Sequence, residues 1–144
     1  MTIQVPRDGA TLEIMKEVIK RSPFSVLIGA EITACKDGYA ELIVPIRREL
    51  TQFHGYAHGA VVGCVADNAC AWAAASLVGE IVTGEYKINF MAPAVGKKLL
   101  GKGYVLKSSR SQLVCRSDVF VISKSEEKLV ATALATIIPK RDRP

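Results

Sequence analysis

Residues that build metal centres, disulfide scaffolds and covalent active sites are scarce in this 144-residue sequence. Its four cysteines form no Cys-x-x-Cys pair, which argues against a zinc knuckle or a thioredoxin-like centre, so we interpret them as small reduced hydrophobes. The only two histidines, His54 and His58, have no third ligand nearby, and no metal is expected. The sequence also lacks a Gly-x-Ser-x-Gly turn, which removes the usual serine nucleophile of α/β-hydrolases.

A large excess of one charge is also missing. Lys and Arg number 19 against 14 Asp and Glu, which gives a formal net charge of +5. This balance favours anionic partners such as phosphates, but the basic residues are scattered and no nucleic-acid partner is expected. With 49% hydrophobic and 23% charged residues, the chain is too apolar for disorder and too weakly charged for a long coiled coil. Its length predicts one domain over residues 1–144.

The sequence contains one long apolar segment, residues 59–78. As a helix it would be roughly 30 Å long, enough to cross a bilayer. Asp67 and Asn68 lie at its centre, however, and an Asp at mid-bilayer costs roughly 2.5–3.5 kcal/mol on insertion scales. Residues 1–9 lack the basic start and apolar run of a secretion signal. We therefore expect a cytoplasmic protein without a membrane partner.

Hydrophobic periodicity predicts two helices. Residues 11–20 place Leu12, Met15, Val18 and Ile19 on one face, as in an amphipathic helix that buries one side. Residues 60–75 are apolar around the whole circumference, which predicts a helix buried on all sides.

Alternating and apolar runs predict six strands. Residues 26–35 and 39–46 flank Lys36-Asp37-Gly38, a turn signal that indicates a β-hairpin. Four further strands, joined by short hairpin loops, are predicted at residues 81–91, 99–107, 113–123 and 128–138. The expected fold class is α+β, with a largely antiparallel sheet wrapped around one buried helix.

Asp67 is the one charged residue inside the apolar helix. A buried carboxylate loses several kcal/mol of solvation unless it has a partner or faces a cavity. Two interpretations stay open on the residues alone. Either backbone donors or a hydroxyl satisfy Asp67 in a structural role, or the carboxylate takes part in catalysis or ligand binding.

The segment before this helix, residues 52–60, is the second candidate. Gly59 and Ala60 let a ligand approach the unpaired N–H groups of the first helical turn, where the helix dipole favours a developing oxyanion. The alternative is that His58 is a loop histidine that caps its own backbone.

Helix geometry relates the two candidates. Nine residues separate His58 from Asp67, which amounts to half a turn of rotation and roughly 13.5 Å along the axis. One helix therefore cannot direct both at the same substrate atom. A site that uses both requires two antiparallel copies of the helix, which a twofold dimer provides twice.

The motif Gln52-x-x-Gly55-x-x-His58-Gly59-Ala60, followed by Asp67 and then by Phe90-Met91-Ala92-Pro93-Ala94, resembles the hotdog-fold acyl-CoA thioesterases of the PaaI-like group. The similarity covers nearly the whole chain. It implies a hotdog fold, in which a six-stranded antiparallel sheet is wrapped around one long central helix. It also implies homodimers that pair into a homotetramer.

The same resemblance implies roles for individual residues. The family's catalytic acid, a nucleophile or a general base, falls on Asp67, and the oxyanion-hole amide falls on Gly59. The residue that positions the thioester or the water falls on Gln52, the helix-start histidine on His58, and a water-holding hydroxyl on Thr83. A thioester is electrophilic enough for one carboxylate, one water and an oxyanion hole to hydrolyse it.

The resemblance also implies two segments that contact coenzyme A, in which Lys107 and Arg110 would meet its phosphates. The expected substrate is acyl-CoA, and no cofactor is expected because coenzyme A is part of the substrate and product. The two segments comprise Phe90, Met91, Ala92, Pro93, Ala94 and Val95, and Lys107, Ser108, Ser109, Arg110, Ser111 and Gln112.

Two departures from the family pattern bear on substrate range. The usual second glycine is Ala60, and Asn68 stands where a short hydroxyl residue is common after the acid. Two other functions remain as alternatives to a thioesterase. One is a non-catalytic acyl-CoA-binding module, and the other is a hotdog enoyl-CoA hydratase or dehydratase, in which the histidine and acid are placed differently.

Overall fold

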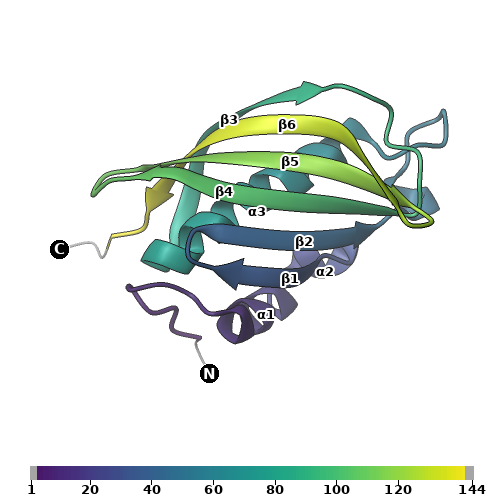
Figure 1. The fold of residues 1–144 in the computed structure, drawn as a ribbon. Coiled ribbons are helices and arrows are strands. Elements are labelled where there is room, and N and C mark those ends of the chain that lie inside the picture. The colour runs from purple at the N-terminus through teal and green to yellow at the C-terminus, as the bar shows by residue number, and fades with distance from the viewer. Residues whose placement is uncertain (1–2, 142–144) are drawn as a thin grey trace.

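The computed structural model describes residues 3–141 as one sheet wrapped around a long helix (Figure 1). The helices are α1 (Leu12–Lys20), α2 (Pro23–Ile28) and α3 (Gly59–Val78), with a 3-10 turn η1 (Arg48–Leu50) before α3. The strands are β1 (Glu31–Lys36), β2 (Tyr39–Pro45), β3 (Ile81–Phe90), β4 (Lys98–Ser108), β5 (Leu113–Ser123) and β6 (Glu126–Pro139).

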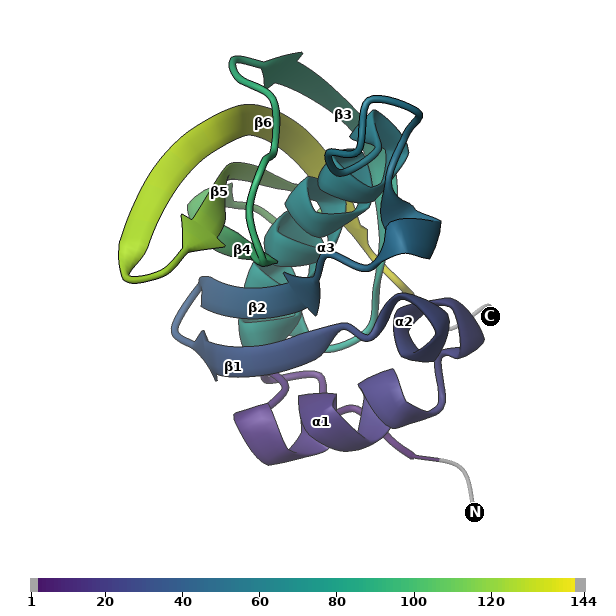
Figure 2. The same ribbon diagram turned by 90° about the vertical axis from the view of Figure 1, so that its right-hand side faces the viewer.

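The sheet has the strand order β1-β2-β4-β5-β6-β3, and every neighbouring pair is antiparallel. It curls around α3, which lies in the concave face (Figure 2). By length and composition α3 is able to cross a membrane, but most of it is buried inside the sheet, as in the core helix of a soluble protein. This arrangement confirms the predicted fold class.

The first correction concerns residues 26–28, which the sequence predicts as the start of a strand. They form the end of α2 instead. Pro23 occupies the first turn of this helix, where its fixed φ suits the helical backbone. Gly29 ends the helix with a φ of 70°, in the left-handed region that glycine adopts at low cost. These two local signals outweigh the strand preference of the apolar residues between them.

The second correction concerns the predicted hairpin between β3 and β4. These strands do not pair, because β4 already has β2 and β5 as its neighbours. β3 pairs only with β6, at the far edge of the sheet, and residues 91–97 cross over to reach β4 (Figure 1). The edge position places β3 alongside α3.

Close contact between α3 and β4 depends on small residues from both elements. Ala69 and Ala73 on α3 are fully buried. A methyl group at Gly103 of β4 would overlap the backbone carbonyl of Ala69, and one at Gly101 would lie 2.7 Å from a methyl of Val65. Backbone therefore lies directly against backbone where the helix crosses the sheet.

This contact predicts a steric effect of Gly103→Ala. Because the added methyl meets backbone rather than a movable side chain, we expect a loss of about 3 kcal/mol or more in the free energy of unfolding, measured by urea denaturation. Gly55→Ala is the control, since open space surrounds Gly55 and only its φ of 88° opposes a side chain, at about 1–2 kcal/mol. Equal losses in the two variants would contradict the proposed overlap.

Candidate active site

The sheet leaves one side of α3 incompletely covered. Cys64, Asp67 and Asn68 are half-buried, whereas the residues around them on the helix are buried. Ala60 at the helix start is exposed. We call the face formed by Ala60, Cys64, Asp67 and Asn68 the open stripe of α3. It is the part of the helix that a ligand or a second chain can reach.

Asp67 has a hydrogen-bond partner on β3. The Thr83 hydroxyl donates to Asp67 Oδ1 over 2.7 Å, so two residues singled out by the sequence lie together. Burial raises the pKa of the Asp67 carboxyl above its ordinary value, because the charged form loses water, and the Thr83 hydrogen bond lowers it in part. A carboxylate with a raised pKa is a better proton acceptor than an exposed one.

The start of α3 has a histidine cap. His58 Nδ1 accepts the Ala60 N–H over 3.0 Å, which caps the first turn of the helix. The His58 carbonyl accepts the N–H groups of Val61 and Val62. Among the residues that the structure describes, the Gly59 N–H has no acceptor. It is thus the first-turn donor available to a substrate oxygen.

Gln52 belongs to the loop that leads into this helix. Its side-chain carbonyl accepts the His54 N–H, and its own N–H donates to the Tyr56 carbonyl over 3.0 Å. Within residues 3–141 it has no hydrogen bond to Asp67. The structure therefore places Gln52 and His58 at the helix start, away from the Asp67–Thr83 pair.

The helix start and Asp67 are separated within one chain. Gly59 precedes Asp67 by eight residues on the same helix, which is roughly 12 Å along the axis. The Gly59 N–H and the Asp67 carboxylate of one chain therefore do not face a common point.

β3 contributes two aromatic residues that lie close to α3. The sequence analysis singled out Phe90 but not Tyr86. The Tyr86 hydroxyl lies 3.1 Å from the position of a Cβ on Gly63, and the Phe90 ring lies 3.5 Å from that of Gly59. Burial and the charge of Asp67 raise the pKa of Tyr86. β3 thus runs along the open stripe with Thr83, Tyr86 and Phe90 toward α3.

A β-bulge explains why Thr83 and Tyr86 share a face. The pairing of β3 with β6 shifts register between Thr83 and Glu85, which adds Gly84 to the strand. Strict alternation would have placed residues 83 and 86 on opposite faces. A glycine inside a strand is the one sequence signal that points to such a bulge.

The two predicted coenzyme A segments lie at opposite ends of the sheet. Phe90 pairs with Ala131, Ala131 with Val119, and Val119 with Gly101, so residue 90 is level with the start of β4. The second segment, residues 107–112, begins at the other end of β4, roughly 23 Å further along the strands. The first segment, residues 90–94, lines a cavity of about 350 Å³ near the start of α3.

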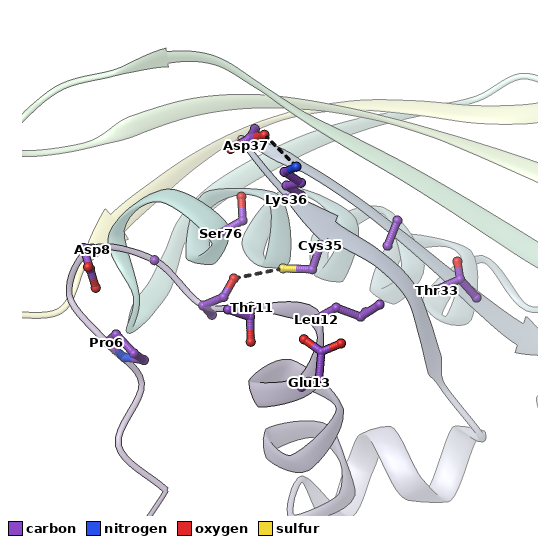
Figure 3. A pocket seen from close by; sticks show the side chains of 13 residues that line it. Pro6, Asp8, Thr11, Leu12, Glu13, Thr33, Cys35, Lys36, Asp37 and Ser76 are labelled. Carbon is purple, nitrogen blue, oxygen red and sulfur yellow. Dashed lines mark hydrogen bonds and ion pairs between the residues drawn. The ribbon is translucent and has the colours of Figure 1, made fainter.

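A larger groove of about 760 Å³ lies elsewhere, between the N-terminal residues and β1 (Figure 3). None of the predicted site residues lines it. Its buried Cys35 thiol donates to the Ala10 carbonyl over 3.6 Å, and burial raises the pKa of this thiol to about 11. A protonated, hydrogen-bonded thiol is a poor nucleophile. In the described part of the chain, no group of three His, Cys, Asp or Glu residues suits a metal ion.

An antiparallel six-stranded sheet curled around one long helix defines a hotdog-fold protein. The family model described as "Thioesterase superfamily" matches residues 54–127. The chain belongs to this superfamily. None of the curated proteins compared with the chain matches it.

Solved structures agree with this assignment. A thioesterase family protein from Silicibacter pomeroyi is 34% identical, with a TM-score of 0.82 over 85% of this chain and 92% of that one. The PaaI protein from the phenylacetic acid degradation operon of E. coli is 18% identical, with a TM-score of 0.77 over 87% and 89%. A thioesterase from Haemophilus influenzae is 21% identical, with a TM-score of 0.80 over 92% of both chains. At these low identities, the similarities to the E. coli and Haemophilus influenzae proteins support the fold alone.

The raised pKa of Asp67 predicts how stability changes with pH. The folded chain keeps the Asp67 proton to higher pH than the unfolded chain, whose pKa is near the ordinary 3.8. In this window the folded state binds more protons, so the contribution of Asp67 to stability falls as the pH rises and stays low above the folded pKa.

We therefore expect Asp67→Asn, which keeps the shape and loses the charge, to be more stable than the wild type at neutral pH. The difference should shrink as the pH falls below the folded pKa, because Asp67 is then neutral as well. Urea midpoints of both proteins across a pH series measure this. A wild type that is more stable at neutral pH would show that the contacts of the carboxylate outweigh its desolvation.

Proposed function

We propose that the protein is an acyl-CoA thioesterase that hydrolyses an acyl-CoA thioester to the free acid and coenzyme A. The observation that carries this proposal is the Asp67–Thr83 pair on the open stripe of the core helix in a chain of the thioesterase superfamily. This pair combines a carboxylate of raised pKa with the one face of α3 that a substrate can reach.

The chemistry follows from these groups. As a general base, Asp67 takes a proton from water while the water oxygen bonds to the thioester carbonyl carbon. The Gly59 N–H, at the positive end of the helix dipole, donates to the carbonyl oxygen as its charge develops. Collapse of the tetrahedral intermediate breaks the carbon–sulfur bond, and the thiolate of coenzyme A receives the proton. As a nucleophile, Asp67 would instead attack the carbonyl carbon itself, and loss of the coenzyme A thiolate would leave a mixed anhydride with the acyl group. Hydrolysis of this anhydride by water would then release the free acid and restore the Asp67 carboxylate, with the thiolate taking up a proton.

A second chain is needed to complete this site. Gly59 and Asp67 are separated along one helix, whereas two antiparallel helices place the Gly59 of one chain opposite the Asp67 of the other. The edge strand β3 supports this arrangement, because its side chains Val82, Tyr86 and Phe90 are exposed in the single chain. A twofold partner would cover both this edge and the open stripe.

The partner also brings the two coenzyme A segments together. Because they lie at opposite ends of one sheet, a twofold axis that sets the two sheets antiparallel side by side would bring residues 90–95 of one chain near residues 107–112 of the other. In this arrangement Lys107 and Arg110 meet the phosphates, and Gln52 and His58 order the loop around the thioester. The homodimer, its pairing into a tetramer and a cytoplasmic location belong to the same proposal.

Replacement of the carboxylate tests the proposed chemistry. Asp67→Asn keeps the shape of the side chain and removes the base, so turnover should fall by about 10²-fold or more. The measurement is thiol release from short, medium, long and aromatic acyl-CoAs. Asp37→Asn, the same change at an exposed position in the turn between β1 and β2, is the control and should retain activity.

Two results would contradict the proposal. Near-normal thiol release by folded Asp67→Asn would remove Asp67 from the reaction. Tight binding of acyl-CoA by the wild type without release of thiol from any substrate would instead identify a non-catalytic binding module.

Mixed dimers test whether each site contains residues of two chains. One parent carries Asp67→Asn and the other Gly59→Pro, which removes the proposed oxyanion N–H. Each folded parent should be inactive. After random re-association, half of the dimers are mixed and one of the two sites in each is intact, so about a quarter of wild-type activity should return. Inactive mixed dimers, verified by mass, would confine the site to one chain.

A further inference from the structure

The Tyr86 hydroxyl lies beside the proposed carboxylate, and no step described above uses it. Thr83 and Tyr86 are successive inward-facing residues of β3, because the bulge at Gly84 lies between them. Thr83 reaches Asp67, whereas Tyr86 lies over the residue one helical turn earlier. Tyr86 is therefore located between the carboxylate and the start of α3.

A glycine of α3 lets this hydroxyl approach the helix. Tyr86 Oη lies 3.1 Å from the position of a Cβ on Gly63, closer than an ordinary van der Waals contact. Among the residues that the structure describes, no group forms a hydrogen bond with Tyr86 Oη. The hydroxyl thus reaches the open stripe with its donor and its acceptor capacity unused.

The Asp67 carboxylate has a matching unused oxygen. Thr83 donates to Oδ1, and within residues 3–141 no donor contacts Oδ2. The Cβ positions of residues 63 and 67 are roughly 5–6 Å apart, as for any two helical residues separated by four. A gap of this size between two polar groups is spanned by one water with two hydrogen bonds of about 2.8 Å.

The protonation of Tyr86 suits it to hold such a water. Burial and the charge of Asp67 raise the pKa of the phenol, so Tyr86 keeps its proton at neutral pH and does not compete with Asp67 as a base. Its oxygen still accepts a hydrogen bond. A water that donates one proton to Asp67 and the other to Tyr86 directs its remaining lone pairs away from both groups, toward a bound thioester.

The proposed dimer encloses this position. When Gly59 of one chain faces Asp67 of the other, the residue midway between them on α3 is Gly63, which then lies at the twofold axis. Tyr86, which is 41% exposed in the single chain, would therefore lie between the two helices and near both sites.

We infer that Tyr86 is a further catalytic residue, whose hydroxyl oxygen and Asp67 Oδ2 together hold the water that attacks the thioester. The inference rests on the proposed function. As the water oxygen bonds to the carbonyl carbon, Asp67 takes one proton and the carbonyl electron pair moves to the oxygen that the Gly59 N–H contacts. The second proton stays on the attacking oxygen, hydrogen-bonded to Tyr86, which keeps its own proton throughout. Thr83 orients the carboxylate.

Tyr86→Phe removes only the hydroxyl. Its kcat for the acyl-CoA that the wild type hydrolyses fastest should fall about tenfold, the effect of one lost hydrogen bond. KM and the Kd of S-butyl-CoA, a thioether that cannot be hydrolysed, should stay unchanged, because the water and not the ligand loses a partner. The matched control is Tyr104→Phe, which removes a hydroxyl of similar exposure (37%) from the outer face of β4 and should behave like the wild type.

The pH dependence of kcat separates Tyr86 from Thr83. Thr83→Val removes a hydrogen bond that lowers the pKa of Asp67, so the rise of kcat with pH should move to higher pH. The titratable groups that interact with Asp67, namely Cys64, Cys70 and Tyr86, all have raised pKa values and stay neutral. Tyr86→Phe should therefore lower the plateau of kcat and leave the rise in place.

Gly63→Ala tests the position of the hydroxyl and keeps the inference testable if Tyr86→Phe does not fold. The added methyl requires Tyr86 Oη to move by a few tenths of an ångström, so kcat should fall severalfold. In the double variant this contact no longer exists, and Gly63→Ala should cause no further loss beyond that of Tyr86→Phe.

Several results would overturn the role of Tyr86. An unchanged kcat in folded Tyr86→Phe, or additive losses in the double variant, would remove the hydroxyl from the reaction. A weaker Kd for S-butyl-CoA with unchanged kcat would mean that Tyr86 contacts the ligand, and a shifted pH dependence would mean that it acts through Asp67. In each of these cases the wild type still hydrolyses acyl-CoA. A wild type that releases no thiol from any acyl-CoA would overturn the proposed hydrolysis as well.

Discussion

The close approach of α3 to β4 is the constraint on which the rest of the structure depends. Small side chains on the helix and the glycines Gly101 and Gly103 on the strand allow backbone to meet backbone at the centre of the sheet. A helix held this closely is nearly enclosed by a curled sheet, and only one stripe of it stays open. That stripe carries Asp67, so the packing that buries the helix also creates the low-dielectric setting that raises the pKa of its carboxyl.

Much of the fold follows from periodicity. The long apolar run of α3 lacks a polar face, and only burial on all sides is compatible with that pattern. The amphipathic spacing of residues 11–20 predicted α1, and the Lys36-Asp37-Gly38 turn predicted the pairing of β1 with β2, in the same way. Two features were not predictable in this way. The caps of α2 override the strand preference of residues 26–28, and the edge position of β3 depends on pairing with a strand that lies 36 residues further along the chain.

The candidate site also contains residues that the sequence indicates and others that only the folded structure reveals. Asp67 stands out in the sequence because it is the one charged residue in an apolar helix. The resemblance to the thioesterase family implied a role for Thr83, which the structure places against Asp67. The position of Tyr86 depends on the bulge at Gly84, a change of register that no hydrophobic pattern reveals.

The edge position of β3 also ties the site to the order in which the chain is synthesised. β3 leaves the ribosome directly after α3, but its strand partner within residues 3–141 is β6, the last of the six strands in chain order. Until β6 emerges, β3 has unpaired N–H and C=O groups along both sides and no register to hold Thr83 against Asp67. In a nascent chain, Asp67 is therefore present before β3 has paired with β6 and fixed the position of the Thr83 hydroxyl. The Asp67–Thr83 pair can thus form in its final geometry only after β6 has been synthesised.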